Sequence, residues 1–138
     1  MTFEQLQSKL DVLKANVDKL AKIPAASYEE FVSDFRNVAS ALYLLQTSIQ
    51  ALIDLGSIVV ASKALPTPRS GHEIFEQLEA ADLLPAGAAA RFAPVIGFRN
   101  RVVHLYDRID ERRVYEILTQ HRHDLAELMD LLLAALED

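Results

Sequence analysis

One stretch, Arg99 to Tyr106, gathers the side chains of this chain that are best suited to chemistry. It reads Arg-Asn-Arg-Val-Val-His-Leu-Tyr. His104 is the one nearby group whose ordinary pKa lies near neutrality, so it can donate or accept a proton. Arg99 supplies a planar guanidinium, which suits bidentate contact with a phosphate. Together these groups fit proton transfer beside a phosphate.

The apolar residues around this stretch fit the buried face of a helix. They recur at steps of three and four residues, as a helix with about 3.6 residues per turn requires: Phe98, Val102, Leu105 and Ile109. On such a helix Arg99 and Tyr106 share one flank. Asn100 and His104 lie together further round, and all four side chains point away from the core. Because Arg99 and His104 are about 140° apart, we expect a kink over residues 94–97, or a second chain, to help them converge.

A structural interpretation of the same residues stays open. Arg99 and His104 could form an exposed, ion-paired set with Asp107 or Asp110. Tyr106 could pack at a helix or dimer seam with its hydroxyl hydrogen-bonded. Composition alone favours both of these interpretations.

The other histidines give no metal-binding pattern. His72 falls in the first turn of an expected short helix and is interpreted as neutral or solvated. His121 and His123 are two residues apart and lack the i, i+4 spacing of a helical metal pair, so we expect both to be solvent-exposed. The chain has no cysteine, which excludes disulfides and thiolate metal sites. We expect no metal and no cofactor.

The charge of the chain limits how it could bind nucleic acid. Its 138 residues carry a net charge of -6, and the pI is about 5.2, which argues against coating nucleic acid with the whole surface. A local site is still compatible with the sequence, although several of its cations could simply form ion pairs on a solvated face. The basic residues around the stretch are all arginines: Arg91, Arg99, Arg101, Arg108, Arg112 and Arg113.

Length and composition indicate one globular domain over residues 1–138. The N-terminus has no basic region followed by an apolar run, so we expect a cytoplasmic protein without a secretory signal. The most apolar stretch, Val38 to Ala61, is interrupted by Gln46, Gln50 and Asp54. It therefore favours a buried helix over a membrane span.

Hydrophobic periodicity predicts an all-α bundle of about five helices. The second helix is long, and the last runs without a break to the C-terminal end. Their expected caps or starts are, in chain order, Thr2, Ser27, Ser70, Pro85 and Asp110.

The long second helix has more apolar residues than one stripe needs. Tyr43, Leu44 and the run Val59 to Ala61 lie outside a strict seam. Either the helix makes core contacts on more than one side, or part of it is a dimer interface. Periodicity cannot separate a partner in the same chain from one in another chain.

The stretch Arg99 to Tyr106 resembles the motif of the HepT-like branch of the HEPN superfamily. The pattern is R-x4-H-x-Y with Asn100 directly after Arg99, and it continues as Asp107-Arg108-Ile109-Asp110. Other segments fit as well and extend the resemblance over nearly the whole chain: Ala51 to Gly56, Pro68 to Leu84 and Val114 to Ile117.

The resemblance implies an all-α homodimer whose two motifs line a shared cleft. It also implies a metal-independent endoribonuclease that cleaves RNA rather than DNA and serves as the toxin of a two-gene module. Such cleavage needs a base, a cation and an acid. Arg99 is then the phosphate clamp, His104 the general base or acid, and Asn100 an orienting hydrogen bond, with Arg101 and Arg108 as further RNA contacts.

The same resemblance implies a protein partner and a modification. The partner is an MntA-type minimal nucleotidyltransferase that transfers AMP from ATP to Tyr106 and silences the toxin. On an ideal helix Tyr106 shares a flank with Arg99, so the added phosphate would compete with RNA for that arginine.

Two other classes of function remain open at this point. One is a non-catalytic helical module that binds a nucleotidyltransferase or its substrate, and the other is a purely structural bundle. The first predicts complex formation without RNA cleavage.

Overall fold

The computed structural model describes residues 2–102 and 108–137. All elements of these ranges are helices, which confirms the all-α class, but they number eight rather than about five. In chain order they are α1 (Phe3–Leu20), α2 (Tyr28–Val32), α3 (Phe35–Ser62), α4 (Gly71–Ala80), α5 (Ala88–Ile96), α6 (Phe98–Val102), α7 (Glu111–Gln120) and α8 (Arg122–Glu137).

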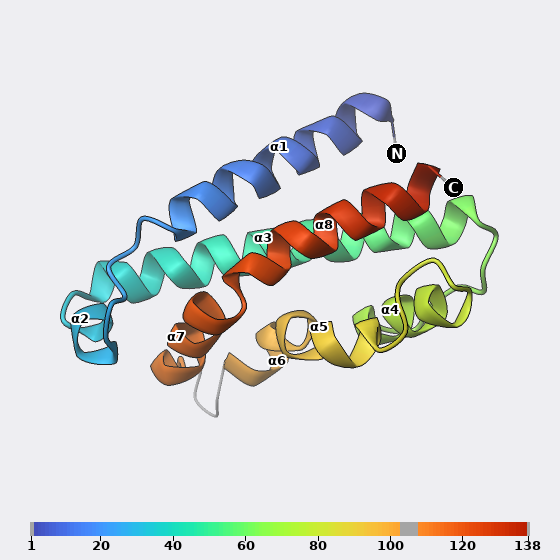
Figure 1. Ribbon diagram of the computed structural model, residues 1–138. Coiled ribbons are helices and arrows are strands. Elements are labelled where there is room, and N and C mark those ends of the chain that lie inside the picture. Colours follow the sequence, from blue (N-terminus) through green and yellow to red (C-terminus); the bar gives the residue numbers. More distant parts are fainter. Residues whose placement is uncertain (1, 103–107, 138) are drawn as a thin grey trace.

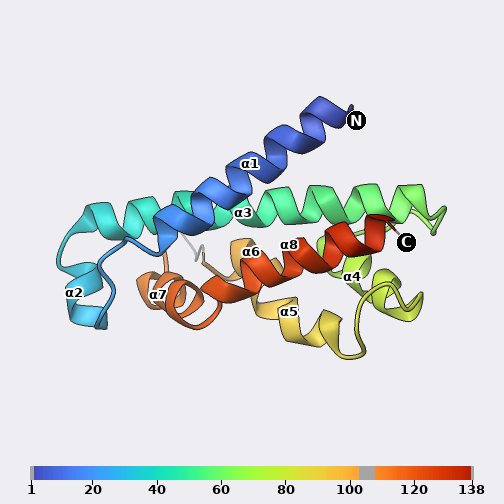
Figure 2. The ribbon, with the colours of Figure 1, turned by 45° about the horizontal axis from the view of Figure 1, so that its top comes forward.

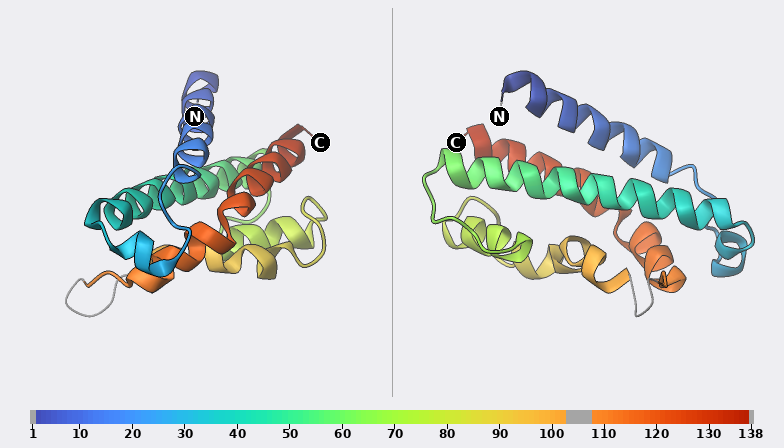
Figure 3. Two further views of the ribbon diagram at one scale, coloured as in Figure 1. Left: turned by 60° about the vertical axis from the view of Figure 1, so that its left-hand side comes forward. Right: turned by 180° about the vertical axis from the view of Figure 1, so that it is seen from behind.

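The helices are arranged in two layers (Figure 1). The long-helix layer consists of α1, α3 and α8, which pack on one another. The short-helix layer consists of α4, α5, α6 and α7 and lies along α3 and α8 (Figure 2). Because α3 contacts helices of both layers, it is the centre of the bundle. Seen from behind, α3 passes in front of α8 (Figure 3, right).

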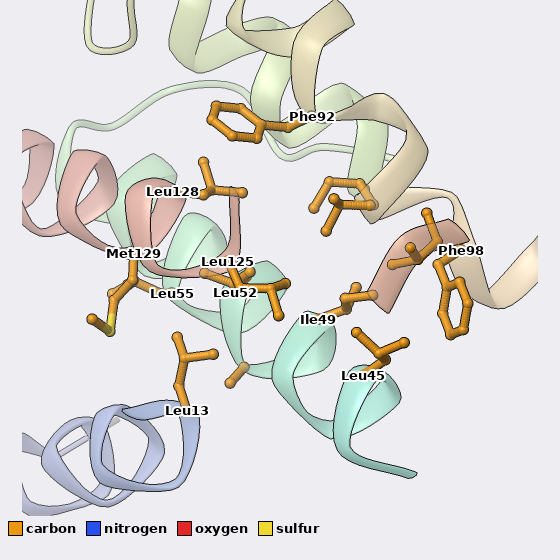
Figure 4. Close-up of a cluster of buried hydrophobic side chains, with 14 of the residues drawn as sticks. Leu13, Leu45, Ile49, Leu52, Leu55, Phe92, Phe98, Leu125, Leu128 and Met129 are labelled. Atoms are coloured by element: carbon orange, nitrogen blue, oxygen red, sulfur yellow. The ribbon is translucent and has the colours of Figure 1, made fainter. Parts of the chain in front are cut away.

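The core lies where the two layers meet (Figure 4). Its side chains come from both layers and are almost wholly buried: Leu13, Leu45, Leu52, Leu55, Phe92, Phe98, Leu125 and Leu128. Burying a side chain of this size contributes roughly 1.5–3 kcal/mol. The periodicity of the long helices therefore determines which face of each helix is buried, and the packing of the two layers determines where each helix lies.

The apolar stretch predicted as a buried helix is α3. By length and composition alone it is apolar enough to cross a membrane, yet 56% of its most apolar window is buried in the protein. Leu44, Val59 and Val60 are buried, so much of the apolar surface outside one stripe serves contacts within the chain. Tyr43, in contrast, is 66% exposed.

Two of the predicted helices are interrupted. The hydroxyl of Ser27 caps α2, accepting from the N–H of Glu30 at 3.1 Å, and the chain then turns before α3. The carboxylate of Asp34 caps α3 by accepting from the N–H of Arg36 at 2.9 Å. The prediction that the long helix begins at Ser27 was wrong, because Asp34 is a strong N-cap inside an apolar pattern that continues on both sides.

The predicted last helix is divided in the same way. Asp110 caps α7 as expected, accepting from the N–H of Arg113 at 3.1 Å. That helix ends at Gln120, and α8 starts at Arg122. The turn between them is held by the Asp124 N–H, which donates to the carbonyl of His121 at 3.0 Å.

Candidate functional site

The site is built on α6, which presents polar groups from a buried anchor. Phe98 and Val102 have 0% exposed surface, whereas Arg99 and Asn100 are exposed. The predicted separation of a core stripe from an outward polar face is therefore confirmed for these four residues. The two fully buried side chains hold the backbone from which Arg99 and Asn100 project.

The break predicted over residues 94–97 is confirmed. α5 ends at Ile96, and the N–H of Gly97 donates to the carbonyl of Ala93 at 2.9 Å. α6 begins directly afterwards, with the N–H of Asn100 donating to the carbonyl of Gly97 at 3.2 Å. Pro94 lacks an N–H and weakens the last turn of α5. The chain can therefore change direction at Gly97.

The motif helix does not continue as far as the sequence pattern suggested. Residues 108–110 are not helical, and the N–H of Asp110 donates to the carbonyl of Val102 at 2.7 Å. Ile109 is partly buried against the core, so it belongs to the predicted apolar set but not to a continuous helix. This contact brings the start of α7 back against the end of α6.

Three arginines near Arg99 in the sequence have partners within the described residues. Arg91 pairs with Asp124 and Glu127 of α8. Arg113 lies 3.5 Å from the carboxylate of Glu116, and the guanidinium of Arg112 stacks 3.9 Å from the centre of the Tyr28 ring. Arg99 has no ion-pair partner among the residues that the structure describes.

A cavity of about 150 Å³ opens beside Arg99. It is lined by residues of three regions far apart in the sequence: Gln50, Ile53, Ser70, Gly71, His72, Ile96, Arg99 and Asn100. Sequence reasoning missed Gln50, and it interpreted His72 as neutral or solvated; the structure places His72 half-buried in the lining of this cavity. No pattern in the sequence joins Gln50 to His72, because only the packing of α3 against α4 brings them together.

The remaining predicted site residues lie partly outside and partly within the described residues. His104, Tyr106 and Asp107 lie outside the described residues, as do any contacts that Arg99 makes with them. Arg108 is exposed, as a nucleic-acid contact requires. Arg101 lies within α6. The roles assigned to these residues stay predictions.

One expectation for the C-terminal histidines was wrong and the other is confirmed. His123 is exposed. His121 is partly buried instead, with its Nδ1 2.9 Å from Oδ2 of Asp124, and the other oxygen of that carboxylate lies 3.1 Å from Arg91. Among the described residues no group of three or more possible metal ligands comes together.

The fold is an all-α bundle in which Arg99 is exposed and has no ion-pair partner among the described residues. Solved structures share this fold. A chain of a complex between a tri-AMPylated Shewanella oneidensis HEPN toxin and an MNT antitoxin is 22% identical, with a TM-score of 0.81 over 97% of this chain and 99% of that chain. A chain of a toxin–antitoxin complex with AMP-PNP is 20% identical, with a TM-score of 0.79 over 96% of this chain and 99% of that chain.

The family model described as "Ribonuclease HepT-like" matches residues 13–132. The chain therefore belongs to the HepT-like ribonuclease family, as the motif predicted. The tRNA nuclease HepT of Aphanizomenon flos-aquae is 29% identical over 110 residues, which cover 80% of this chain and 75% of that protein. The mRNA nuclease HepT of Shewanella oneidensis is 22% identical over 127 residues, which cover 92% and 95% respectively.

Proposed function

We propose that this protein is the toxin of a toxin–antitoxin pair and acts as a metal-independent endoribonuclease in the cytoplasm. The observation that carries the proposal is Arg99, an exposed cation with no ion-pair partner in residues 2–102 and 108–137, followed by Asn100 on a helix that Phe98 anchors in the core. Its relatives are named as nucleases of tRNA and mRNA. The proposal rests on this geometry together with family membership.

The chemistry assigned to the site follows from what RNA cleavage needs. The 2′-hydroxyl attacks the adjacent phosphorus, so a base must take its proton and an acid must protonate the departing 5′-oxygen. His104 is assigned one of these two proton transfers. Arg99 stabilises the negative charge that grows on the phosphate, Asn100 orients it by a hydrogen bond, and Arg101 and Arg108 contact the flanking RNA.

A homodimer would complete this site. Phe35 and Tyr43 on α3 are 80% and 66% exposed. On an ideal helix they lie within about 80° of Gln50 and Ile53, which line the cavity beside Arg99. A second copy that covers this face of α3 would place its own motif close to the first, so that two His104 side chains could share the two proton transfers. Light scattering that finds a monomer at micromolar concentration would contradict the shared cleft.

Inactivation is assigned to modification of Tyr106 by a nucleotidyltransferase antitoxin of the MntA type. The solved relatives include a tri-AMPylated toxin bound to an MNT antitoxin. Attack of the Tyr106 oxygen on the α-phosphorus of ATP forms the phosphodiester bond and releases pyrophosphate. After incubation with the partner and ATP, intact-mass measurement should find added AMP on the wild-type chain and none on Tyr106→Phe. Added mass on Tyr106→Phe would contradict this assignment.

The activity is tested most simply by expression. The wild-type chain without its partner should arrest growth and cleave cellular RNA, and His104→Ala should do neither. His123→Ala is the matched control, because this histidine is exposed on α8 and away from the motif. If the wild type is harmless and cleaves no RNA while still binding its partner, the chain is instead the non-catalytic module.

A further inference from the structure

The cavity beside Arg99 is large enough to hold part of a ligand. Its volume is about 150 Å³, whereas one water molecule occupies roughly 30 Å³ of liquid. Its lining combines residues of α3 and α4 with Ile96 and the first residues of α6. A ring-sized group could therefore enter it while the chain that carries this group passes Arg99.

The cavity has an apolar part and a polar part. Ile53 and Ile96 supply the apolar part, and Gly71 lets the start of α4 approach both of them. A Cβ at Gly71 would lie 3.3 Å from Cγ2 of Ile96 and 3.4 Å from Cδ1 of Ile53. The polar part consists of the side chains of Gln50, His72, Arg99 and Asn100 together with Ser70. Ser70 Oγ already accepts from the N–H of Glu73.

The polar groups match a nucleobase better than a second phosphate. Among the described residues that line the cavity, Arg99 is the one arginine or lysine. Gln50 donates its Nε2–H to Asp54 at 2.9 Å, and the other oxygen of Asp54 lies 2.8 Å from Nζ of Lys9. Because Nε2 of Gln50 donates to Asp54, its Oε1 is left to accept a hydrogen bond. The charge of Asp54 is balanced by that of Lys9. Amides, which donate and accept, are the groups that read the edges of unstacked bases, and histidine is among those that contact their faces.

We propose that this cavity takes one nucleobase of the RNA next to the phosphate that Arg99 binds, and that Gln50 and His72 set the base preference of cleavage. Gln50 hydrogen-bonds to the base edge, and the imidazole of His72 contacts the ring. This inference rests on the proposed ribonuclease function, and it adds a specificity site formed by α3 and α4 outside the motif.

The test measures binding of single-stranded hexamers of 2′-O-methyl-RNA to the purified full-length chain. These probes lack the free 2′-hydroxyl that the attack requires, so they bind without being cleaved. Homopolymers of uracil, cytosine and adenine and an abasic hexamer are compared. The wild type should prefer one base on the order of tenfold and should bind the abasic hexamer on the order of tenfold more weakly than that base.

Two variants and two matched controls separate base recognition from folding. Gln50→Ala should equalise the three homopolymers, and His72→Ala should weaken all three on the order of tenfold while leaving the abasic hexamer unchanged. Gln7→Ala is the control for Gln50→Ala, because Gln7 makes the same contact to Asp11, four residues on, at 3.0 Å on α1. His123→Ala controls for His72→Ala. Both controls should behave as the wild type.

The outcomes distinguish failure of the inference that the cavity binds a nucleobase from failure of the proposed ribonuclease function. If the wild type cleaves RNA but Gln50→Ala and His72→Ala keep its affinities and its cleavage sites, the base pocket is wrong and the ribonuclease stands. If both variants lose affinity for the abasic hexamer equally, the cavity binds phosphate and the inference is overturned. If the wild type neither binds these probes nor cleaves RNA, the proposed function fails and the inference fails with it.

Discussion

The two layers of the bundle divide the work of the molecule between them. The long-helix layer of α1, α3 and α8 supplies a large share of the buried core, with continuous helices and leucine-rich faces (Figure 4). The short-helix layer consists of four short helices, α4 to α7, and the chain changes direction between them. Polar groups line the cavity where α4 and α6 start. Burial of apolar side chains therefore determines the structure of the long-helix layer, whereas the starts of the helices position the polar candidate residues of the short-helix layer.

Two arginines of the short-helix layer show this difference at the scale of single residues. Arg91 on α5 is tied to Asp124 and Glu127 of α8 and so links the two layers. Arg99, only two turns later in the sequence, has no ion-pair partner among the described residues. Identical side chains thus differ in their contacts: Arg91 links the two layers, whereas Arg99 forms no ion pair within the part of the chain that the structure describes.

The largest expected effect tests whether α6 depends on the common core. Phe98→Ala removes a fully buried ring and should lower the free energy of unfolding by about 3–5 kcal/mol, measured by urea denaturation. Phe35→Ala is the matched control, because Phe35 is 80% exposed and should change the value by less than about 0.5 kcal/mol. Equal effects of the two substitutions would mean that α6 is not anchored as described.

A smaller effect is expected at Gly56, where α3 approaches α4 closely. A Cβ added to Gly56 of α3 would lie 2.8 Å from Cγ2 of Ile74 on α4, and a buried β-branched side chain cannot easily rotate away. Gly56→Ala should therefore destabilise the fold by about 1–3 kcal/mol. Ser57→Ala, on the exposed neighbouring residue, should be neutral within about 0.5 kcal/mol. A neutral Gly56→Ala would show that the layers can separate at little cost.

The smallest effect concerns a cap within the short-helix layer. The carboxylate of Glu79 accepts from the N–H groups of Ala89 at 2.8 Å and Gly87 at 3.1 Å. These bonds, that to Ala89 first, hold the pKa of Glu79 below its ordinary value of 4.5. Because the folded state favours the charged form, this stabilisation is present above that ordinary value and is lost as the pH falls through the lowered pKa.

Glu79→Gln should accordingly lower the Tm near neutral pH, with a deficit that shrinks in strongly acidic buffer. Glu76→Gln is the control, since Glu76 is exposed on the same helix. A Tm deficit of Glu79→Gln that does not change with pH would show that the charge of this cap contributes nothing.

The sequence was most informative where local chemistry decides the structure. The buried Phe98 and Val102, the break at Gly97 and the cap at Asp110 follow from spacing and residue type, and all are observed. The break before Asp34 could not be read, because the apolar pattern continues across it. The division of the last helix at His121 could not be predicted either. It depends on contacts of His121 with Asp124, which the apolar pattern does not reveal.

Candidate site residues were predictable only within the motif. Arg99 and Asn100 were identified from residue type, and their exposure agrees with the helical pattern. Gln50 and His72 reach the same cavity through the packing of α3 against α4, and periodicity carries no information on which helices become neighbours. Roles for His104 and Tyr106 stay predictions from the family resemblance.

The most direct test of the central claim measures RNA cleavage by the purified protein in excess chelator. The wild type should cleave RNA, and Arg99→Ala should reduce the rate by about a hundredfold to a thousandfold without changing the urea midpoint. Arg91→Ala should show the reverse, a lower midpoint with cleavage retained. Loss of stability in Arg99→Ala with full cleavage, or cleavage that stops in chelator, would contradict the proposal that Arg99 serves metal-free RNA cleavage rather than the stability of the fold.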